Sequence, residues 1–194
     1  MEIGVLALQG AVREHRDMLT GLGVECCEVR TPEQLESLDG LLMPGGESTT
    51  LEKLMRRFGL DVALQEAIDR GMAVWGTCAG MILLAQRITN AIPGQTGLGH
   101  LPVVVERNAF GRQVESCETI VEVRGLKPAA FPAVFIRAPR VVESLSAEVE
   151  TLGTWEGSVV AVRYQRLLAT SFHPELTHDD RLHRYFLESV VGGQ

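Results

Sequence analysis

The segment VWGTCAGM at residues 74–81 decides the expected fold and its chemistry. An apolar strand pattern precedes this segment, a helical pattern follows it, and a glycine stands two positions to either side of Cys78. This is the cysteine form of G-x-S-x-G, the tight strand-to-helix turn that presents a nucleophile at the edge of a sheet. Free amides and the positive dipole at the start of the following helix favour a thiolate. Taken alone, the segment predicts a reactive Cys78 or, equally, an inert buried cysteine in a glycine-lined turn.

The rest of the chain predicts an α/β fold. Short apolar runs alternate with helical patterns in the first half, as in parallel α/β proteins. We expect strands at residues 3–8, 24–30, 40–43 and 72–75, and helices at residues 13–22, 50–57, 61–70 and 80–87. β-branched segments in the second half predict further strands, some antiparallel, at residues 103–105, 119–123, 133–136, 158–162 and 167–170. A helix at residues 181–191 would close a single domain spanning residues 1–194.

Length and composition narrow the possible functions. The chain has 194 residues, 45% of them hydrophobic, and a formal net charge of -7 without a long run of one sign, which argues against nucleic-acid binding. The sequence contains neither a long apolar run nor a basic leader before its first apolar stretch, so we expect a cytoplasmic protein without a membrane span. Its four cysteines contain no C-x-x-C pair and should be reduced thiols.

A second candidate segment, HPE at residues 173–175, follows the last expected strand. Proline at position 174 favours an extended His173, and residues two apart in extended chain project to the same side. Glu175 could therefore orient the His173 ring, which gives the base and the carboxylate of a nucleophile–base–carboxylate relay. Two alternatives remain open, a surface loop without chemistry and a metal cluster that would add His178, Asp179 and Asp180.

The third candidate is the loop PGGEST at residues 44–49, which also follows an expected strand. Paired glycines permit backbone conformations in which amides point at an anion, so the loop could supply an oxyanion donor. A turn followed by a helix cap at Ser48 or Thr49 is the simpler interpretation, and both can hold together. Neither this loop nor the glycine cluster at residues 94–99 fits a nucleotide-binding motif.

Together and in this order, the three segments resemble the class I (triad) glutamine amidotransferase family. Further stretches are similar to the branch of that family that supplies ammonia for pyridoxal 5'-phosphate synthesis. They lie at residues 8–15, 44–50, 76–80, 106–113, 135–139 and 171–177. The resemblance covers nearly the whole chain and shows no departure at a motif position.

The resemblance implies a flavodoxin-like three-layer α/β/α domain, with a mostly parallel sheet extended by antiparallel strands. Cys78 would be the nucleophile, His173 its base and Glu175 the orienting carboxylate. The amides of Gly46 and Ala79 would form the oxyanion hole. The residues implied in glutamine binding are Gly46, Glu47, Ser48, Arg107, Ile136 and Arg137.

The implied activity is hydrolysis of L-glutamine to L-glutamate and ammonia through a cysteine thioester, without a metal or another cofactor. The ammonia would pass to a separate (β/α)8 pyridoxal 5'-phosphate synthase subunit, in an assembly with twelve copies of each subunit. The alternatives are a glutaminase of another triad amidotransferase, a flavodoxin-like cysteine hydrolase or redox protein, and a non-catalytic binding subunit. The intact set of Cys78, His173 and Glu175 argues against the last of these.

Overall fold

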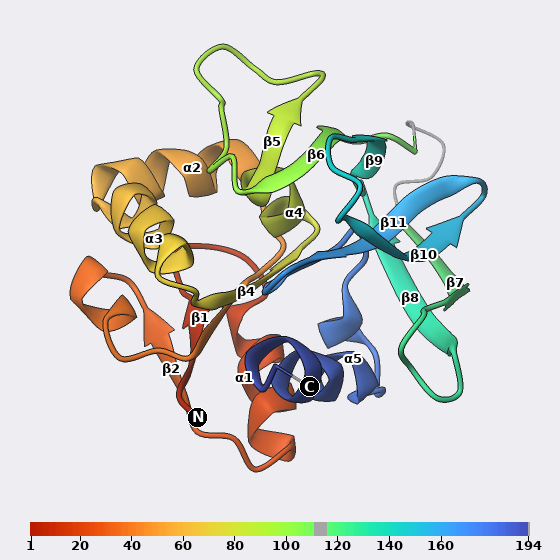
Figure 1. Ribbon diagram of the computed structural model, residues 1–194, viewed down its shortest axis with the longest axis horizontal. Helices are drawn as coiled ribbons and strands as arrows, with labels where there is room; N and C mark the ends of the chain where they lie inside the picture. Colours follow the sequence, from red (N-terminus) through yellow and green to blue (C-terminus); the bar gives the residue numbers. More distant parts are fainter. Residues whose placement is uncertain (111–115, 194) are drawn as a thin grey trace.

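The computed structural model describes residues 1–110 and 116–193, and ten of the strands in these residues form one sheet. One half of the sheet is parallel, in the order β2-β1-β3-β4-β12 (Figure 1). These strands are β1 (Ile3–Leu6), β2 (Cys26–Val29), β3 (Gly40–Met43), β4 (Ala73–Thr77) and β12 (Leu167–Thr170). The order is the 2-1-3-4-5 order of flavodoxin-like domains, which bind ligands at the carboxyl ends of their strands. The flavodoxin-like expectation is confirmed.

The other half of the sheet continues from β12 in the order β11-β9-β6-β5, and β10 also pairs with β11. β11 is antiparallel to β12 and β9, and β9 is antiparallel to β6, while β5 is parallel to β6. A separate antiparallel hairpin joins β7 to β8. The bounds are β5 (Ala85–Ile88), β6 (Leu101–Glu106), β7 (Ser116–Glu122), β8 (Ala130–Ile136), β9 (Arg140–Ser144), β10 (Glu150–Trp155) and β11 (Ser158–Tyr164).

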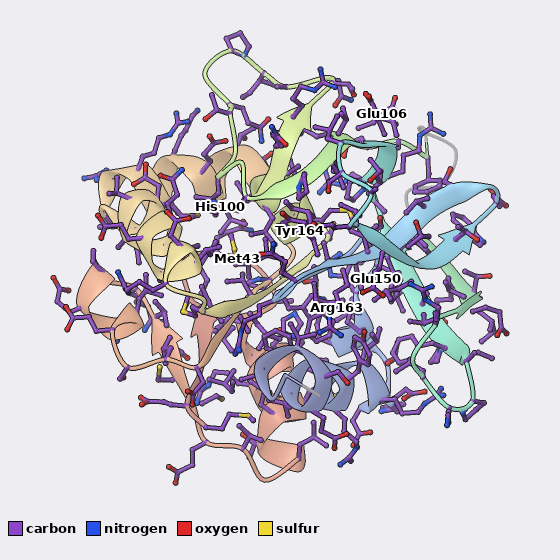
Figure 2. All side chains as sticks on the ribbon, viewed as in Figure 1. Met43, His100, Glu106, Glu150, Arg163 and Tyr164 are labelled. Carbon is purple, nitrogen blue, oxygen red and sulfur yellow. The ribbon has the colours of Figure 1, made fainter. Side chains whose placement is uncertain are left out.

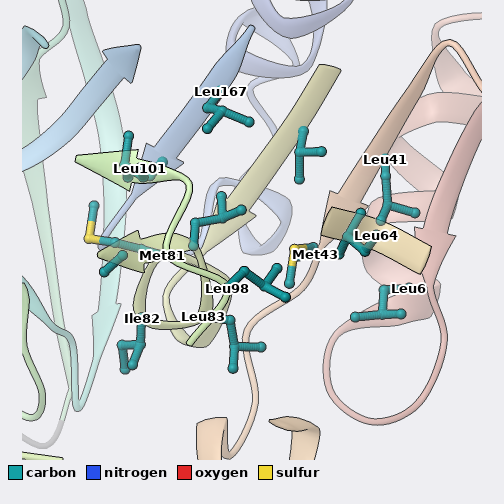
Figure 3. Close-up of a cluster of buried hydrophobic side chains, with 14 of the residues drawn as sticks. Leu6, Leu41, Met43, Leu64, Met81, Ile82, Leu83, Leu98, Leu101 and Leu167 are labelled. Carbon is teal, nitrogen blue, oxygen red and sulfur yellow. The ribbon is translucent and has the colours of Figure 1, made fainter. Parts of the chain in front are cut away.

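Helices cover both faces of the sheet. α2 (Ser48–Arg57), α3 (Leu60–Asp69) and α4 (Ala79–Leu84) share one hydrophobic cluster, and α1 (Val12–Gly21) and α5 (Arg181–Tyr185) share the other. Successive strand side chains point to opposite faces, so Leu41 and Met43 of β3 enter the first cluster and Leu42 enters the second. Figure 3 shows Leu41 and Met43 in the first cluster beside Leu64 of α3. The expected three layers are thus confirmed.

The C-terminal helical segment is hydrogen-bonded to β11. α5 continues as a π-helix over Phe186–Val191, within the helical range expected for residues 181–191. Arg163 of β11 is labelled in Figure 2. It donates hydrogen bonds to Ser189 O at 2.9 Å and to the Tyr185 hydroxyl at 3.4 Å. Short 3-10 turns at Pro32–Leu35 and Pro174–Leu176 complete the secondary structure. In the described part of the chain, every helix is too short or too polar to span a bilayer.

One predicted helix is wrong at its end. The apolar pattern predicts a helix over residues 80–87, but α4 ends at Leu84 and the chain continues directly as β5. All six residues of α4 are buried, so the helix has no polar face, and the sequence pattern does not show where the helix ends. Pairing of β5 with β6 provides partners for the backbone that leaves the helix.

Three strands are missing from the sequence prediction: β5, which falls in the predicted helix, and β9 and β10. Charged residues interrupt the apolar pattern of β9, and Gly153 lies between two register shifts in β10. β9 is specified by antiparallel pairing with β6 and β11, which local propensity does not reveal, whereas β10 forms a hairpin with β11, the next strand along the chain. The remaining expected strands and helices are confirmed, with ends that shift by a few residues.

Candidate active site

The three candidate segments meet at the carboxyl ends of β3, β4 and β12, where they line one cavity of about 340 Å³. This volume lies near the lower end of the ~300–1,000 Å³ range of small-molecule sites. The loop after β1 joins them, because Ala11 N donates a hydrogen bond to Gly45 O at 3.2 Å. The cavity therefore occupies the edge of the sheet where this topology places ligands.

Cys78 stands on a strained turn between β4 and α4. Its backbone φ is 49°, a value that costs a residue with a side chain roughly 1–3 kcal/mol and that the surrounding packing must enforce. A Cβ on Gly76 would lie 2.4 Å from the Gly80 carbonyl carbon, and a Cβ on Gly80 would lie 2.3 Å from Met43 O. Both flanking glycines are therefore required by close backbone contacts, and the turn places a nearly buried Cys78 at the cavity wall.

His173 and Glu175 complete a relay with Cys78. His173 Nδ1 lies 2.7 Å from Glu175 Oε1, and His173 lines the same cavity as Cys78, whose thiol donates to Ile136 O at 3.8 Å. Since Glu175 occupies Nδ1, the ring nitrogen left for the thiol is Nε2. The backbone amide of His173 donates to Val134 O at 2.8 Å, which fixes the segment against β8.

Burial and hydrogen bonds compete in setting the charges of this relay. Burial disfavours a charged imidazole, but the contacts with Cys78 and Glu175 outweigh it and raise the pKa of His173 to about 10. Burial likewise favours a neutral Glu175, yet the adjacent His15 and His173 hold the pKa of this carboxyl below its ordinary value. The raised pKa of His173 and the lowered pKa of Glu175 favour a protonated imidazole beside an ionised carboxylate.

Each residue that the sequence analysis assigned to glutamine binding lines this cavity. They are Gly46, Glu47 and Ser48 after β3, Arg107 after β6, and Ile136 and Arg137 at the end of β8, and Ala79 lies beside them. Glu175 does not line the cavity but lies behind His173. Arg107 Nη2 is 3.5 Å from Glu47 Oε1, so a cation and an anion stand side by side at the wall.

The geometry of the HPE segment does not support the metal-cluster alternative. Asp179 Oδ1 accepts a hydrogen bond from Arg181 Nε at 2.9 Å, and Asp180 Oδ2 pairs with Arg184 at 3.1 Å. Across residues 1–110 and 116–193, no three His, Cys, Asp or Glu side chains converge as metal ligands would. Of the expected 106–113 stretch, residues 111–113 lie outside the described residues.

Comparison with known proteins identifies the family. The SNO glutamine amidotransferase family model matches residues 5–192. The chain belongs to this family. Two relatives, each named pyridoxal 5'-phosphate synthase subunit PdxT, support the same placement. The Dehalococcoides mccartyi (strain BAV1) protein is 54% identical over 189 residues, covering 97% of this chain and 96% of the relative. The Thermotoga maritima protein is 53% identical over 190 residues, covering 98% and 100%.

Solved structures agree with the fold of this amidotransferase. A crystal structure of a glutamine amidotransferase superimposes with a TM-score of 0.91 at 52% identity, covering 98% of each chain. The crystal structure of a putative GMP synthase component from Thermoplasma acidophilum gives a TM-score of 0.72 at 20% identity, covering 100% of this chain and 94% of that one. Because the identity is only 20%, this second similarity supports the fold alone. The expected family and the α/β fold class are confirmed.

The sequence analysis missed Gln95, a buried side chain of the amidotransferase that joins two of the predicted binding residues. Gln95 Nε2 donates to Ser48 Oγ at 3.0 Å, and Gln95 Oε1 accepts from Arg107 Nη1 at 2.9 Å. The Gln95 loop is anchored in turn by Glu52 Oε1, which accepts from Thr96 N at 2.9 Å. A polar residue inside the glycine cluster at residues 94–99 was the available signal, but its partners are distant in the sequence.

Gly45 gives a first test of how tightly the site is packed. A Cβ at this position would lie 2.2 Å from His173 Cε1, so we expect Gly45→Ala to push the ring out of line with Cys78. A displacement of about 1 Å at a catalytic group can lower turnover about 10²-fold. Turnover of glutamine should fall by that order in Gly45→Ala and stay unchanged in Gly21→Ala, because a Cβ on Gly21 meets no atom within 4 Å. Equal activities of the two variants would contradict this geometry.

Proposed function

We propose that the protein is the glutaminase subunit of a pyridoxal 5'-phosphate synthase, which hydrolyses L-glutamine and passes ammonia to a synthase subunit. The observation that carries this proposal is the Cys78–His173–Glu175 relay at one wall of a cavity that also holds paired charges. The full-length similarity to relatives named pyridoxal 5'-phosphate synthase subunit PdxT supports the choice of pathway.

The charges of the cavity suit a free amino acid. Arg107 and Glu47 together can pair with the α-carboxylate and the α-ammonium group of glutamine. Arg137 adds a second cation to the same wall. With its α-carbon held there, the side-chain carboxamide of glutamine would extend toward Cys78.

In the proposed reaction, the Cys78 thiolate attacks the carboxamide carbon, and a tetrahedral intermediate forms. The amides of Gly46 and Ala79 stabilise its oxyanion, and Ala79 is the first residue of α4, where a backbone amide has no acceptor within the helix. His173 then protonates the departing ammonia, which leaves a γ-glutamyl thioester on Cys78. Water activated by the same His173 hydrolyses the thioester and releases glutamate.

The partner in this proposal is a (β/α)8 synthase subunit in a cytoplasmic assembly with twelve copies of each chain, and the glutaminase site needs no cofactor. Ammonia released without an acceptor is wasted, so we expect the partner to stimulate turnover. The carbonyl of the Gly45–Gly46 peptide accepts from Ala11 N, and because paired glycines can flip at small conformational cost, docking of the partner could set the direction of the Gly46 amide toward the oxyanion.

An isotope experiment tests the proposal. Glutamine labelled with ¹⁵N in its side-chain amide would be supplied to the protein alone, and to the protein with the other synthase substrates and the synthase partner. We expect glutamate release that rises with the partner, and ¹⁵N in the pyridoxal 5'-phosphate ring. Glutamate release without incorporation would favour another amidotransferase, and no release in either sample would refute the glutaminase.

The contacts of Gln95 predict that its substitution weakens substrate binding more than it lowers turnover. Gln95→Leu removes the acceptor of Arg107 and the donor to Ser48, so the KM for glutamine should rise about tenfold while kcat changes little. Gln95→Glu keeps an acceptor for Arg107, and the Ser48 hydroxyl can rotate to donate, so this variant should recover most of the affinity. Steady-state kinetics over a range of glutamine concentrations gives both constants, and a loss confined to kcat would oppose this role.

The raised pKa of His173 predicts the alkaline limb of activity. Burial acts against the proton on His173, but Cys78 and Glu175 raise the pKa to about 10, so the proton needed by ammonia is lost only as pH rises through that value. kcat/KM should therefore hold its plateau to about pH 9 and fall above it. Melting curves at each pH separate titration from unfolding, and a fall centred near neutral pH would contradict the assignment.

A further inference from the structure

Two histidines that the proposed mechanism does not use lie buried behind the relay. His15 on α1 and His183 on α5 are both 0% exposed, and His15 Nδ1 lies 3.0 Å from His183 Nε2. The other nitrogen of His15, Nε2, is 3.5 Å from Glu175 Oε2 and 3.3 Å from Thr77 Oγ1. A line of side chains thus runs from His183 through His15 and Glu175 to His173.

Glu175 needs a donor on the side that His15 occupies. Its Oε1 pairs with His173 Nδ1, while its buried Oε2 has no hydrogen-bond partner among the described residues. An ionised carboxylate oxygen removed from water is costly unless a donor faces it. His15 Nε2, 3.5 Å from Oε2, is the ring nitrogen placed to be that donor, with Thr77 Oγ1 at 3.3 Å as its competing acceptor.

The contacts of His183 specify which nitrogen of His15 carries the proton. His183 Nδ1 is buried without a hydrogen-bond partner among the described residues, and an unpaired lone pair there is tolerated better than an unpaired N–H. The proton of His183 is therefore on Nε2 and is donated to His15 Nδ1. His15 must then carry its own proton on Nε2, directed at Glu175.

Packing and burial keep this arrangement neutral and fixed. The His183 ring lies against Trp75, with centroids 4.9 Å apart, and Trp75 Nε1 donates to Thr170 Oγ1 at 3.2 Å. Burial lowers the pKa of both histidines, and a charge on His173 lowers that of His15 further, against the opposing effects of Glu175 and Glu14. Both rings are therefore neutral near pH 7.

We infer that His15 is a positioning residue, whose Nε2–H, oriented by His183, holds Glu175 in the conformation that binds and orients His173. The inference rests on the proposed glutaminase chemistry for its effect on turnover. It extends the relay from three side chains to five.

Substitution of His15 separates this role from a general packing role. Leucine removes the donor, whereas the amide nitrogen of glutamine reaches the position of Nε2. With the synthase subunit present, His15→Leu should lower kcat for glutamate release about 10- to 100-fold, with KM within about threefold. His15→Gln should recover most of kcat, and His100→Gln, at a histidine outside the site, should match the unaltered protein. Equal losses in His15→Leu and His15→Gln would overturn the inference.

The pH profile adds a readout that packing alone would not move. The ionisable groups facing Glu175 are His15 and His173, and His183, Glu14 and Cys78 act on it through these two rings. Without the His15 donor, the pKa of Glu175 rises, so the acid limb of kcat/KM in His15→Leu should shift to higher pH. An unchanged acid limb, with activity lost only in proportion to folded protein, would reduce His15 to a structural residue.

Imidazole ¹⁵N shifts of the unaltered protein give a test that needs no activity. We expect both His15 and His183 to be neutral and protonated on Nε2 near pH 7. A proton on His15 Nδ1, or titration of His15 at neutral pH, would overturn the inference even if every variant failed to fold. If the unaltered protein released no glutamate, the proposed function would fail while these shifts still decided the hydrogen-bond arrangement.

Discussion

Cys78→Ala should lower glutamate release by about 10⁴- to 10⁶-fold, the size of loss seen when a relay nucleophile is removed. Among the described residues, Cys78 is the cysteine that lines the cavity, and His173 lines the same cavity. Its neighbours would remain in place, because alanine keeps the Cβ on which the tight turn is built. Turnover would be measured by glutamate formation at saturating glutamine with the synthase subunit present.

Cys27→Ala provides a matched control for Cys78→Ala. Cys27 lies on β2 and does not line the cavity, so its substitution should leave turnover within about twofold. Melting temperatures and binding to the synthase subunit should be preserved in both variants. More than a tenth of the original turnover in Cys78→Ala would refute the nucleophile assignment.

His173→Asn should cost nearly as much as loss of Cys78, and Glu175→Gln should be milder by at least about tenfold. His173 moves protons in both halves of the proposed reaction, whereas Glu175 orients and stabilises the ring. The double variant Cys78→Ala with His173→Asn should be scarcely worse than either single variant, because members of one relay are not additive. Initial rates of glutamate formation would be compared for the unaltered protein, the three single variants and the double variant.

Two results would count against the proposed roles of His173 and Cys78, and the first of them would favour the metal alternative. Stoichiometric zinc or another divalent ion in the purified protein, together with turnover that EDTA abolishes, would contradict a metal-independent His173. Additive effects of the two substitutions would indicate that Cys78 and His173 act in separate steps.

The sequence predicted the strands of the parallel half of the sheet and the three segments that line the cavity, because each of these is a local feature. The glycines around Cys78, the spacing of His173 and Glu175, and the paired glycines after β3 each fix a short backbone geometry. The parallel strands then bring these turns together, since their carboxyl ends share one edge.

The remaining features depend on contacts between distant segments. The end of α4 is set by pairing of β5 with β6, and β9 is formed by pairing on both of its sides. Gln95 and His15 could not be predicted from the sequence for the same reason. Nothing in their local sequence shows that folding buries them beside functional side chains. Gln95 acquires its role from burial between Ser48 and Arg107, and His15 acquires its role from burial behind Glu175.

Covalent labelling by a diazoketone analogue of glutamine tests the central claim most directly. The ketone of the reagent lies where the carboxamide carbonyl of glutamine would lie, and its diazo carbon takes the place of the amide nitrogen. This carbon is protonated and then alkylates the thiolate with loss of N₂, so only a nucleophile aligned with bound substrate should react. Peptide mass mapping after treatment with the synthase subunit present should find one label per chain, on Cys78, and excess glutamine should prevent it. A label on Cys26, Cys27 or Cys117, or labelling that glutamine does not prevent, would contradict the account.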